Sequence, residues 1–113
     1  MTPLLERKLI DKYPKLFRQA SLSIQESCMA WGIDTGDGWY QILEDLCEEL
    51  SQISGVEFAQ IKNKFGLLRI YIDNPTEEAN LLIGEAEIKS AHTCESCGFP
   101  GEQDGWIIRC EKC

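Results

Sequence analysis

Four cysteines near the C-terminus have the residue type and spacing that chemistry constrains most tightly. They form two Cys-x-x-Cys pairs separated by twelve residues: Cys94 and Cys97, then Cys110 and Cys113. Each pair can present two thiolates to one metal ion, and the interval lets the second pair fold back to complete a tetrahedron. The spacing predicts a bound Zn²⁺ in a compact ribbon or knuckle, and a disulfide-linked or redox-active tail is the alternative. Because four thiolates leave no open coordination position, we expect this metal to be structural.

The remaining candidates for chemistry do not form a recognisable catalytic set. His92 is the only histidine and lies two residues before the first cysteine pair, but four cysteines already complete a metal site. The chain has no nucleophile elbow, no phosphate-binding glycine loop before a helix and no histidine–carboxylate pair at metalloprotease spacing. Cys28 and Cys47 have no partner at ligand spacing, so we expect both to be buried as small hydrophobic residues. These observations favour a non-enzymatic protein.

Two other groups of residues are candidates for binding a partner or a ligand. The first combines aromatic residues with glycines in a long irregular segment: Trp31, Asp37, Trp39 and Tyr40. Its rings either anchor a partner or seal the core beneath the loop, and the core role is favoured. The second is a basic island in an acidic chain: Lys62, Lys64, Phe65 and Arg69. It suits a small anionic ligand or the acidic helix of a second copy in a homodimer, and an ordinary exposed turn is the alternative.

The charge of the chain bears on which partners it can meet. The chain has eleven Lys and Arg residues and nineteen Asp and Glu residues, which gives a net charge of −8. Residues 21–61 contain no Lys or Arg. Such a surface repels a phosphate backbone, which counts against nucleic acid, but it can meet a basic patch on another protein. No apolar run is long enough for a membrane span, and the N-terminus lacks the layout of a signal peptide. We therefore expect a cytoplasmic protein with reduced thiols.

The order of elements predicts an α+β fold in which helices pack on an antiparallel β-hairpin. The expected helices cover residues 3–12, 38–54 and 75–90, and the expected strands cover 56–62, 67–72 and 106–108. Asp37 is expected to cap the central helix, and Gly55 to end it. Asn74 is expected to cap the last helix, with Pro75 at its first position. Residues 19–38 show no clean period, and the chain divides into an α+β domain, 1–92, and a zinc ribbon, 93–113.

Several joined motifs resemble a family of small phage- and prophage-associated proteins with a C-terminal four-cysteine zinc ribbon. They are Cys28-Met-Ala-Trp-Gly, Gly36-Asp-Gly-Trp-Tyr, Leu46-Cys-Glu-Glu-Leu, Lys64-Phe-Gly-Leu-Leu-Arg-Ile-Tyr and Cys94-Glu-Ser-Cys-Gly. The resemblance covers most of the chain and implies a phage-related origin with the same helix–hairpin–helix–zinc layout. It carries over no activity. Ala30 stands where related members have a second cysteine near the tryptophan, which weakens the idea of a second metal site.

The leading functional hypothesis is therefore a non-enzymatic, zinc-containing binding protein of phage origin. Its expected partner is a host or phage protein, and inhibition of a host defence protein is one form of this role. A second hypothesis is the capture of a small ligand or nucleotide by the aromatic loop and the basic hairpin. A DNA-binding regulator that uses the ribbon is a third and weaker one.

Overall fold

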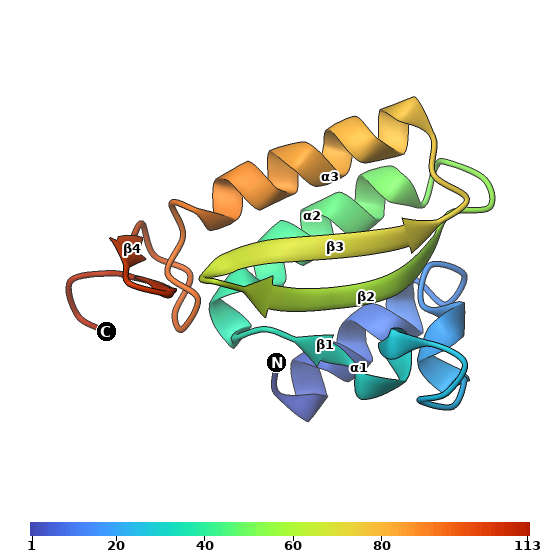
Figure 1. The fold of residues 1–113 in the computed structure, drawn as a ribbon, viewed down its shortest axis with the longest axis horizontal. Helices are drawn as coiled ribbons and strands as arrows, with labels where there is room; N and C mark the ends of the chain where they lie inside the picture. Colours follow the sequence, from blue (N-terminus) through green and yellow to red (C-terminus); the bar gives the residue numbers. More distant parts are fainter.

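Three helices lie against a three-stranded sheet, and a small ribbon closes one end of the molecule (Figure 1). The structure is a computed structural model and describes residues 1–113. The helices are α1 (Pro3–Lys12), α2 (Tyr40–Leu50) and α3 (Glu77–Ser90), and the strands are β1 (Ile33–Asp34), β2 (Glu57–Lys64), β3 (Leu67–Asp73), β4 (Glu102–Asp104) and β5 (Ile107–Arg109). Short 3-10 turns cover Arg18–Ser21, Cys28–Trp31 and Asp37–Trp39. The predicted α+β class is confirmed.

The sheet has the order β1-β2-β3, and its centre is the predicted hairpin. Strands β2 and β3 pair antiparallel, so that Lys62 lies opposite Arg69. Strand β1 adds to the other side of β2 in parallel, with Ile33 opposite Ile61. The two residues of β1 come from the segment that showed no period, because a strand this short cannot display one.

The core forms where α2 and α3 cover one face of the sheet. The fully buried large side chains come from both layers. Trp39 and Leu43 lie before and on α2, and Phe58 and Leu68 lie on β2 and β3. The apolar stripe predicted for the central helix is confirmed, because its Ile, Leu and Cys positions from 42 to 50 are buried. The opposite face of the sheet has no helix over it in Figure 1, and it carries the basic residues of the hairpin.

The start of the central helix differs from the prediction. Residues Asp37–Trp39 form a 3-10 turn, and α2 begins at Tyr40 without a side-chain cap. The Asp37 carboxylate instead accepts a hydrogen bond of 2.7 Å from the backbone N–H of Thr2. The helix ends at Leu50 with Ser51 as its C-cap, so the prediction that it continues to residue 54 and is ended by Gly55 is wrong. Turns follow, and Gly55 has a left-handed backbone there, with φ of 85°.

The start of the last helix is also corrected. Thr76, and not Asn74, caps α3, because its hydroxyl accepts the N–H of Ala79 at 3.1 Å. Asn74 has a φ of 57°, which is incompatible with the extended backbone of an N-cap residue, and its amide donates to the Gly55 carbonyl at 2.9 Å. The asparagine therefore closes the base of the hairpin.

Helix α3 also protects the outer edge of the sheet. The N–H of Leu68 donates to the Ser90 hydroxyl at 3.1 Å, and the N–H of Ile70 donates to the Glu87 carboxylate at 3.2 Å. Backbone groups at the edge of a sheet otherwise offer a template for pairing with another chain. Side chains of α3 thus occupy part of the free edge of β3.

A buried glutamine joins the 3-10 turns to both strands at the open end of the hairpin, where Glu57 lies opposite Asp73. The Gln19 amide donates to Glu57 at 3.2 Å and to Asp73 at 2.6 Å, and its carbonyl oxygen accepts the Ser27 hydroxyl at 2.7 Å. Hydrogen bonds from Arg18 and then Gln19 lower the pKa of Glu57 below its ordinary value of 4.5. The ionised Glu57 carboxylate therefore stabilises the fold above about pH 4.5, and this contribution is lost as the pH falls through the lowered pKa.

Replacing this amide by a carboxylate tests its role. We expect Gln19→Glu to lower the free energy of unfolding at pH 7 by about 2 kcal/mol, because two donors vanish and three carboxylates meet. Urea denaturation at pH 7 and pH 5 measures the effect, and the loss should shrink at pH 5 as the introduced carboxyl group takes up a proton. Gln25→Glu, at an exposed position, is the matched control. Equal stability of the two variants would contradict the assignment.

Candidate metal centre

The four predicted cysteine ligands converge at the C-terminal end of the chain. The sulfur atoms of Cys94, Cys97, Cys110 and Cys113 all lie within 4.8 Å of one another, and those of Cys97 and Cys110 are 3.5 Å apart. A tetrahedral Zn²⁺ with bonds of about 2.3 Å requires sulfur separations of about 3.8 Å. No disulfide links any of the six cysteines. The cluster therefore has the donors and the spacing to hold one tetrahedral metal ion.

Turns and a short hairpin bring the two cysteine pairs together. In the first pair, the N–H of Gly98 donates to the Cys94 carbonyl at 2.9 Å, and Gly98 has a φ of 84° that other residues rarely adopt. Strands β4 and β5 then return the chain, with Gln103 opposite Ile108. The N–H of Glu95 donates to the Ile108 carbonyl at 2.9 Å and fastens the first pair to the strand that leads into the second.

The electrostatics of the cluster favour a bound cation. Burial acts to raise the pKa of the Cys94 thiol, but backbone hydrogen bonds from Cys110, Cys97 and Ser96 outweigh it and lower the pKa to about 6. The side chains of Cys110, Cys94 and Cys97 raise the pKa of Cys113 to about 12. Sulfurs this close cannot all ionise near neutral pH by themselves. A central cation would compensate their charges and stabilise all four thiolates.

The cluster is fixed to the body of the protein through Glu95. Its carbonyl accepts the N–H of Gly38 at 2.6 Å, and its carboxylate accepts the N–H of Gly36 at 2.8 Å and the Asn63 amide at 2.6 Å. The indole N–H of Trp39 donates to the Thr93 carbonyl at 2.9 Å. One residue between two of the clustered cysteines thus contacts both the segment before α2 and the end of β2.

The aromatic loop does not form a single surface. Trp39 is fully buried in the core, whereas Trp31 is 71 % exposed and Tyr40 is partly buried. The Asp37 carboxylate accepts the hydrogen bond from the backbone N–H of Thr2. Asp37 and Tyr40 line one surface depression together with Cys97, whereas Trp31 does not line it.

The basic hairpin meets the ribbon at its tip, which sequence reasoning missed. Phe65, 61 % exposed, packs edge-on against Trp106, 72 % exposed, with ring centroids 5.5 Å apart. A Cβ atom on Gly66 would lie only 2.8 Å from the Trp106 carbonyl carbon, so glycine permits this close approach. We call Phe65, Trp106 and the neighbouring exposed Ile107 the tip surface. No pattern in the sequence predicts a contact between residues 65 and 106, and from the sequence Trp106 is predicted only to be part of a strand.

The cations of the hairpin lie beside this tip on the uncovered face of the sheet. Lys62 and Lys64 form no ion pair, and the Arg69 guanidinium lies 3.9 Å from the Glu87 carboxylate. The three side chains share one face because Lys62 pairs with Arg69 and Lys64 follows two residues along β2. They form a local positive area in a chain of net charge −8.

The remaining candidates are not among the four clustered cysteines, although His92 lines a surface depression with Cys110 and Cys113. His92 is exposed, and the group of potential ligands contains only cysteines. Cys47 is fully buried, as predicted, but the same prediction is wrong for Cys28, which is exposed. In the 3-10 turn that starts at Cys28, the inward position belongs to the next residue, Met29.

This contrast predicts selective labelling of the thiols. In protein with the cluster metal-bound, we expect a disulfide reagent to modify Cys28 at least about 100-fold faster than Cys47, because Cys47 is fully buried and burial raises the pKa of its thiol. Mass spectrometry of the labelled peptides gives both rates. The Cys28→Ser variant should lose the fast phase; a fast phase that persists would contradict the expectation.

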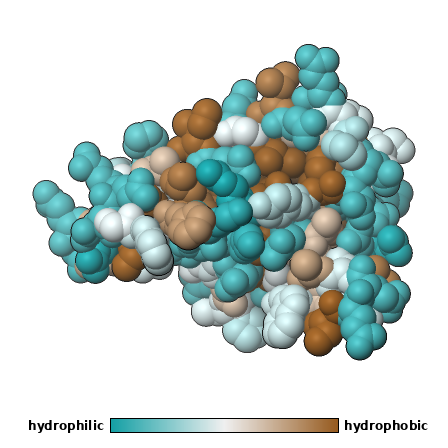
Figure 2. Space-filling model, in the orientation of Figure 1, coloured by the Kyte–Doolittle hydropathy of each residue, from teal (hydrophilic) through white to brown (hydrophobic).

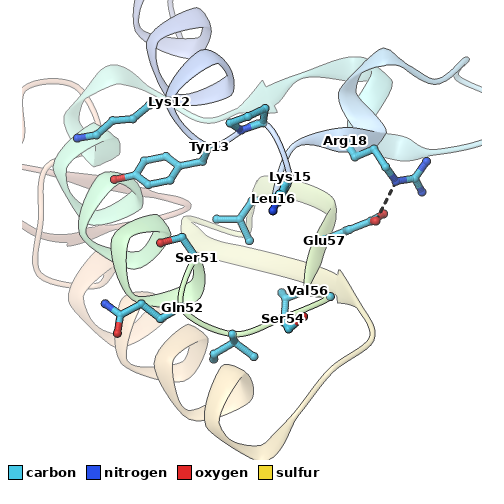
Figure 3. A pocket seen from close by; sticks show the side chains of 13 residues that line it. Lys12, Tyr13, Lys15, Leu16, Arg18, Ser51, Gln52, Ser54, Val56 and Glu57 are labelled. Carbon is cyan, nitrogen blue, oxygen red and sulfur yellow. Dashed lines mark hydrogen bonds and ion pairs between the residues drawn. The ribbon is translucent and has the colours of Figure 1, made fainter.

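A cavity of about 740 Å³ lies between the end of α1 and the segment from α2 to β2, remote from the cysteines (Figure 3). Its cations are largely paired: the Lys12 ammonium lies 3.0 Å from Glu44, and the Arg18 guanidinium lies 2.8 Å from Glu57. The Tyr13 hydroxyl donates to Glu48 at 2.9 Å. These contacts tie the elements around the cavity together, and we assign it no chemistry.

Fold and cluster together define a small α+β protein with a C-terminal ribbon whose four clustered cysteines could hold a metal ion. Comparisons with protein-family models, with curated proteins and with solved structures give no match. None of the helices combines the length and the apolar character needed to cross a membrane.

Proposed function

We propose that the cluster holds one structural Zn²⁺ and that the chain is a non-enzymatic protein that binds another protein. The support for zinc is the donor set, because four thiolates at tetrahedral spacing match the sites that this ion stabilises. The four sulfurs fill its coordination sphere and leave no position for substrate. The metal holds the ribbon in place, and the ribbon holds half of the tip surface.

The observation that carries the binding role is the pair of exposed rings at the tip. Phe65 and Trp106 come from different parts of the chain and stay mostly exposed after they meet. Aromatic rings on a fixed support are the residues most often found at the energetic centre of protein interfaces. We propose that a host or phage protein covers this tip, in keeping with a phage origin, and that inhibition of a host defence protein is its biological purpose.

A comparison of baits tests this role. Zinc-loaded wild-type protein, the double variant Phe65→Ala/Trp106→Ala and the control Leu4→Ala are each used to capture proteins from host lysate. Leu4 is 74 % exposed on α1 and serves as a matched loss of apolar surface. We expect one partner to be retained by wild type and control and lost by the double variant. Identical capture by all three baits would refute the role of the tip.

A second candidate function is the capture of a small anion by the positive area of the sheet. The favouring observation is that Lys62 and Lys64 form no ion pair although the chain is strongly acidic. A thermal-shift screen with nucleotides and inorganic phosphate tests it. Stabilisation that disappears in Lys64→Glu supports capture, and the absence of any shift at millimolar ligand removes it.

A further inference from the structure

The outer face of α3 carries an apolar stripe that the fold leaves uncovered. Leu81 is 64 % exposed and Ile88 is 66 % exposed, and they lie seven residues apart on one side of the helix. Gly84 lies between them, and a Cβ atom added there would meet nothing within 4 Å. The opposite side of the same helix contributes Ala79, Ile83 and other residues to the core. Figure 2 shows hydrophobic side chains at the surface over this helix.

From this stripe we infer that the chain forms a symmetric homodimer in which two copies of α3 cross in an antiparallel manner at Gly84. A two-fold interface needs a surface that is complementary to itself. With Gly84 near the symmetry axis, Leu81 of one copy packs against Ile88 of the other, and the reverse contact follows by symmetry. The glycine lets the two helices approach closely at the crossing point.

The charges at the ends of α3 fix the direction of the pairing. Glu77 and Glu78 lie at its start and Lys89 near its end, and none of them forms an ion pair within the chain. An antiparallel crossing places the acidic start of one helix beside the basic end of the other. A parallel crossing would place like charges together, which is unfavourable.

The same geometry sets limits on the strength of the dimer. A single pair of helices of this length buries less surface than a standard stable interface, so we expect a dissociation constant on the order of 10–100 µM. Glu85 of each copy approaches the axis and repels its equivalent. Because each chain also carries a net charge of −8, the dimer should strengthen as the salt concentration rises.

Sedimentation equilibrium of the full zinc-loaded chain, from about 5 to 500 µM, tests the inference against this affinity range. We expect a monomer–dimer equilibrium whose dissociation constant rises at least about tenfold in Leu81→Glu, because a charge then enters an apolar contact. Ile24→Glu, an exposed apolar residue outside α3, should leave the constant unchanged. Glu85→Gln should tighten the dimer. Thermal melting checks that each variant stays folded.

A cross-linking experiment tests the position of the axis. In a Cys28→Ser background, Gly84→Cys should form a covalent dimer on mild oxidation, because residue 84 faces its own equivalent. Gln25→Cys in the same background should not. A wild-type chain that stays monomeric at the highest concentration overturns the inference, and so does a dimer that is unaffected by Leu81→Glu. Neither result bears on the tip surface, which is tested separately by capture.

Discussion

Removal of the proposed zinc by a chelator is expected to lower the melting temperature of this protein by more than 10 °C. The cause is that the ribbon contributes Ile108 to the main core and, through Glu95 and Thr93, holds the segment before α2. Structural zinc sites supply folding free energy, and we expect Cys94→Ser to cost about 4 kcal/mol because Cys94 is fully buried. Thermal melting measures the loss of stability, and mass spectrometry in parallel measures the zinc content of each sample.

The control for this experiment is the cysteine outside the cluster. Cys28→Ser should keep one zinc per chain and the wild-type melting temperature, because Cys28 is exposed and remote from the ligands. Protein purified under reducing conditions should contain zinc in a ratio of about one. A chain that lacks the metal, or whose melting curve does not move with the chelator, would contradict the structural role.

The second large effect is expected at Gly38, where the ribbon approaches the body most closely. A Cβ atom at this position would lie 2.6 Å from the carbonyl carbon of Glu95 and would collide with the Cys94 carbonyl oxygen. The obstruction is the backbone of Cys94 and Glu95, which a hydrogen bond from Glu95 to Ile108 fastens, so it cannot move aside as a side chain would. We expect Gly38→Ala to lower the free energy of unfolding by about 3 kcal/mol and to weaken zinc retention, because the first cysteine pair is displaced.

Urea denaturation and competition with a zinc chelator give the two readouts. Gly84→Ala is the matched control, because its Cβ meets nothing and the residue lies inside a helix. We expect that control to stabilise the monomer by about 0.5–1 kcal/mol through helix propensity. If the two glycine variants were equally stable, the close docking of the ribbon would be refuted.

The local patterns of the sequence were sufficient for much of the fold. The stripe of the central helix, the hairpin and the α+β class follow from residue periods and turn residues, because each depends on neighbours within a few positions. Helix ends were less well predicted. Asn74 and Thr76 are both good caps by type, and the left-handed backbone of Asn74 is decided by its bond to Gly55, nineteen residues away.

For the cysteine cluster too, the sequence predicts the contacts between near neighbours but not those between distant residues. The spacing of the two cysteine pairs predicts the ligands directly, because thiolate geometry constrains a Cys-x-x-Cys turn within four residues. The spacing does not reveal that Glu95 binds Gly36, Gly38 and Asn63, because these partners are more than thirty residues away.

The sequence by itself determined which four cysteines cluster, the main helices and the hairpin. Only the tertiary structure decided that Phe65 meets Trp106, that β1 joins the sheet, and that Cys28 faces solvent while Met29 faces the core. The physical reason is that local periodicity records which side of an element is apolar. Which distant segment covers that side depends on how all the elements pack at once.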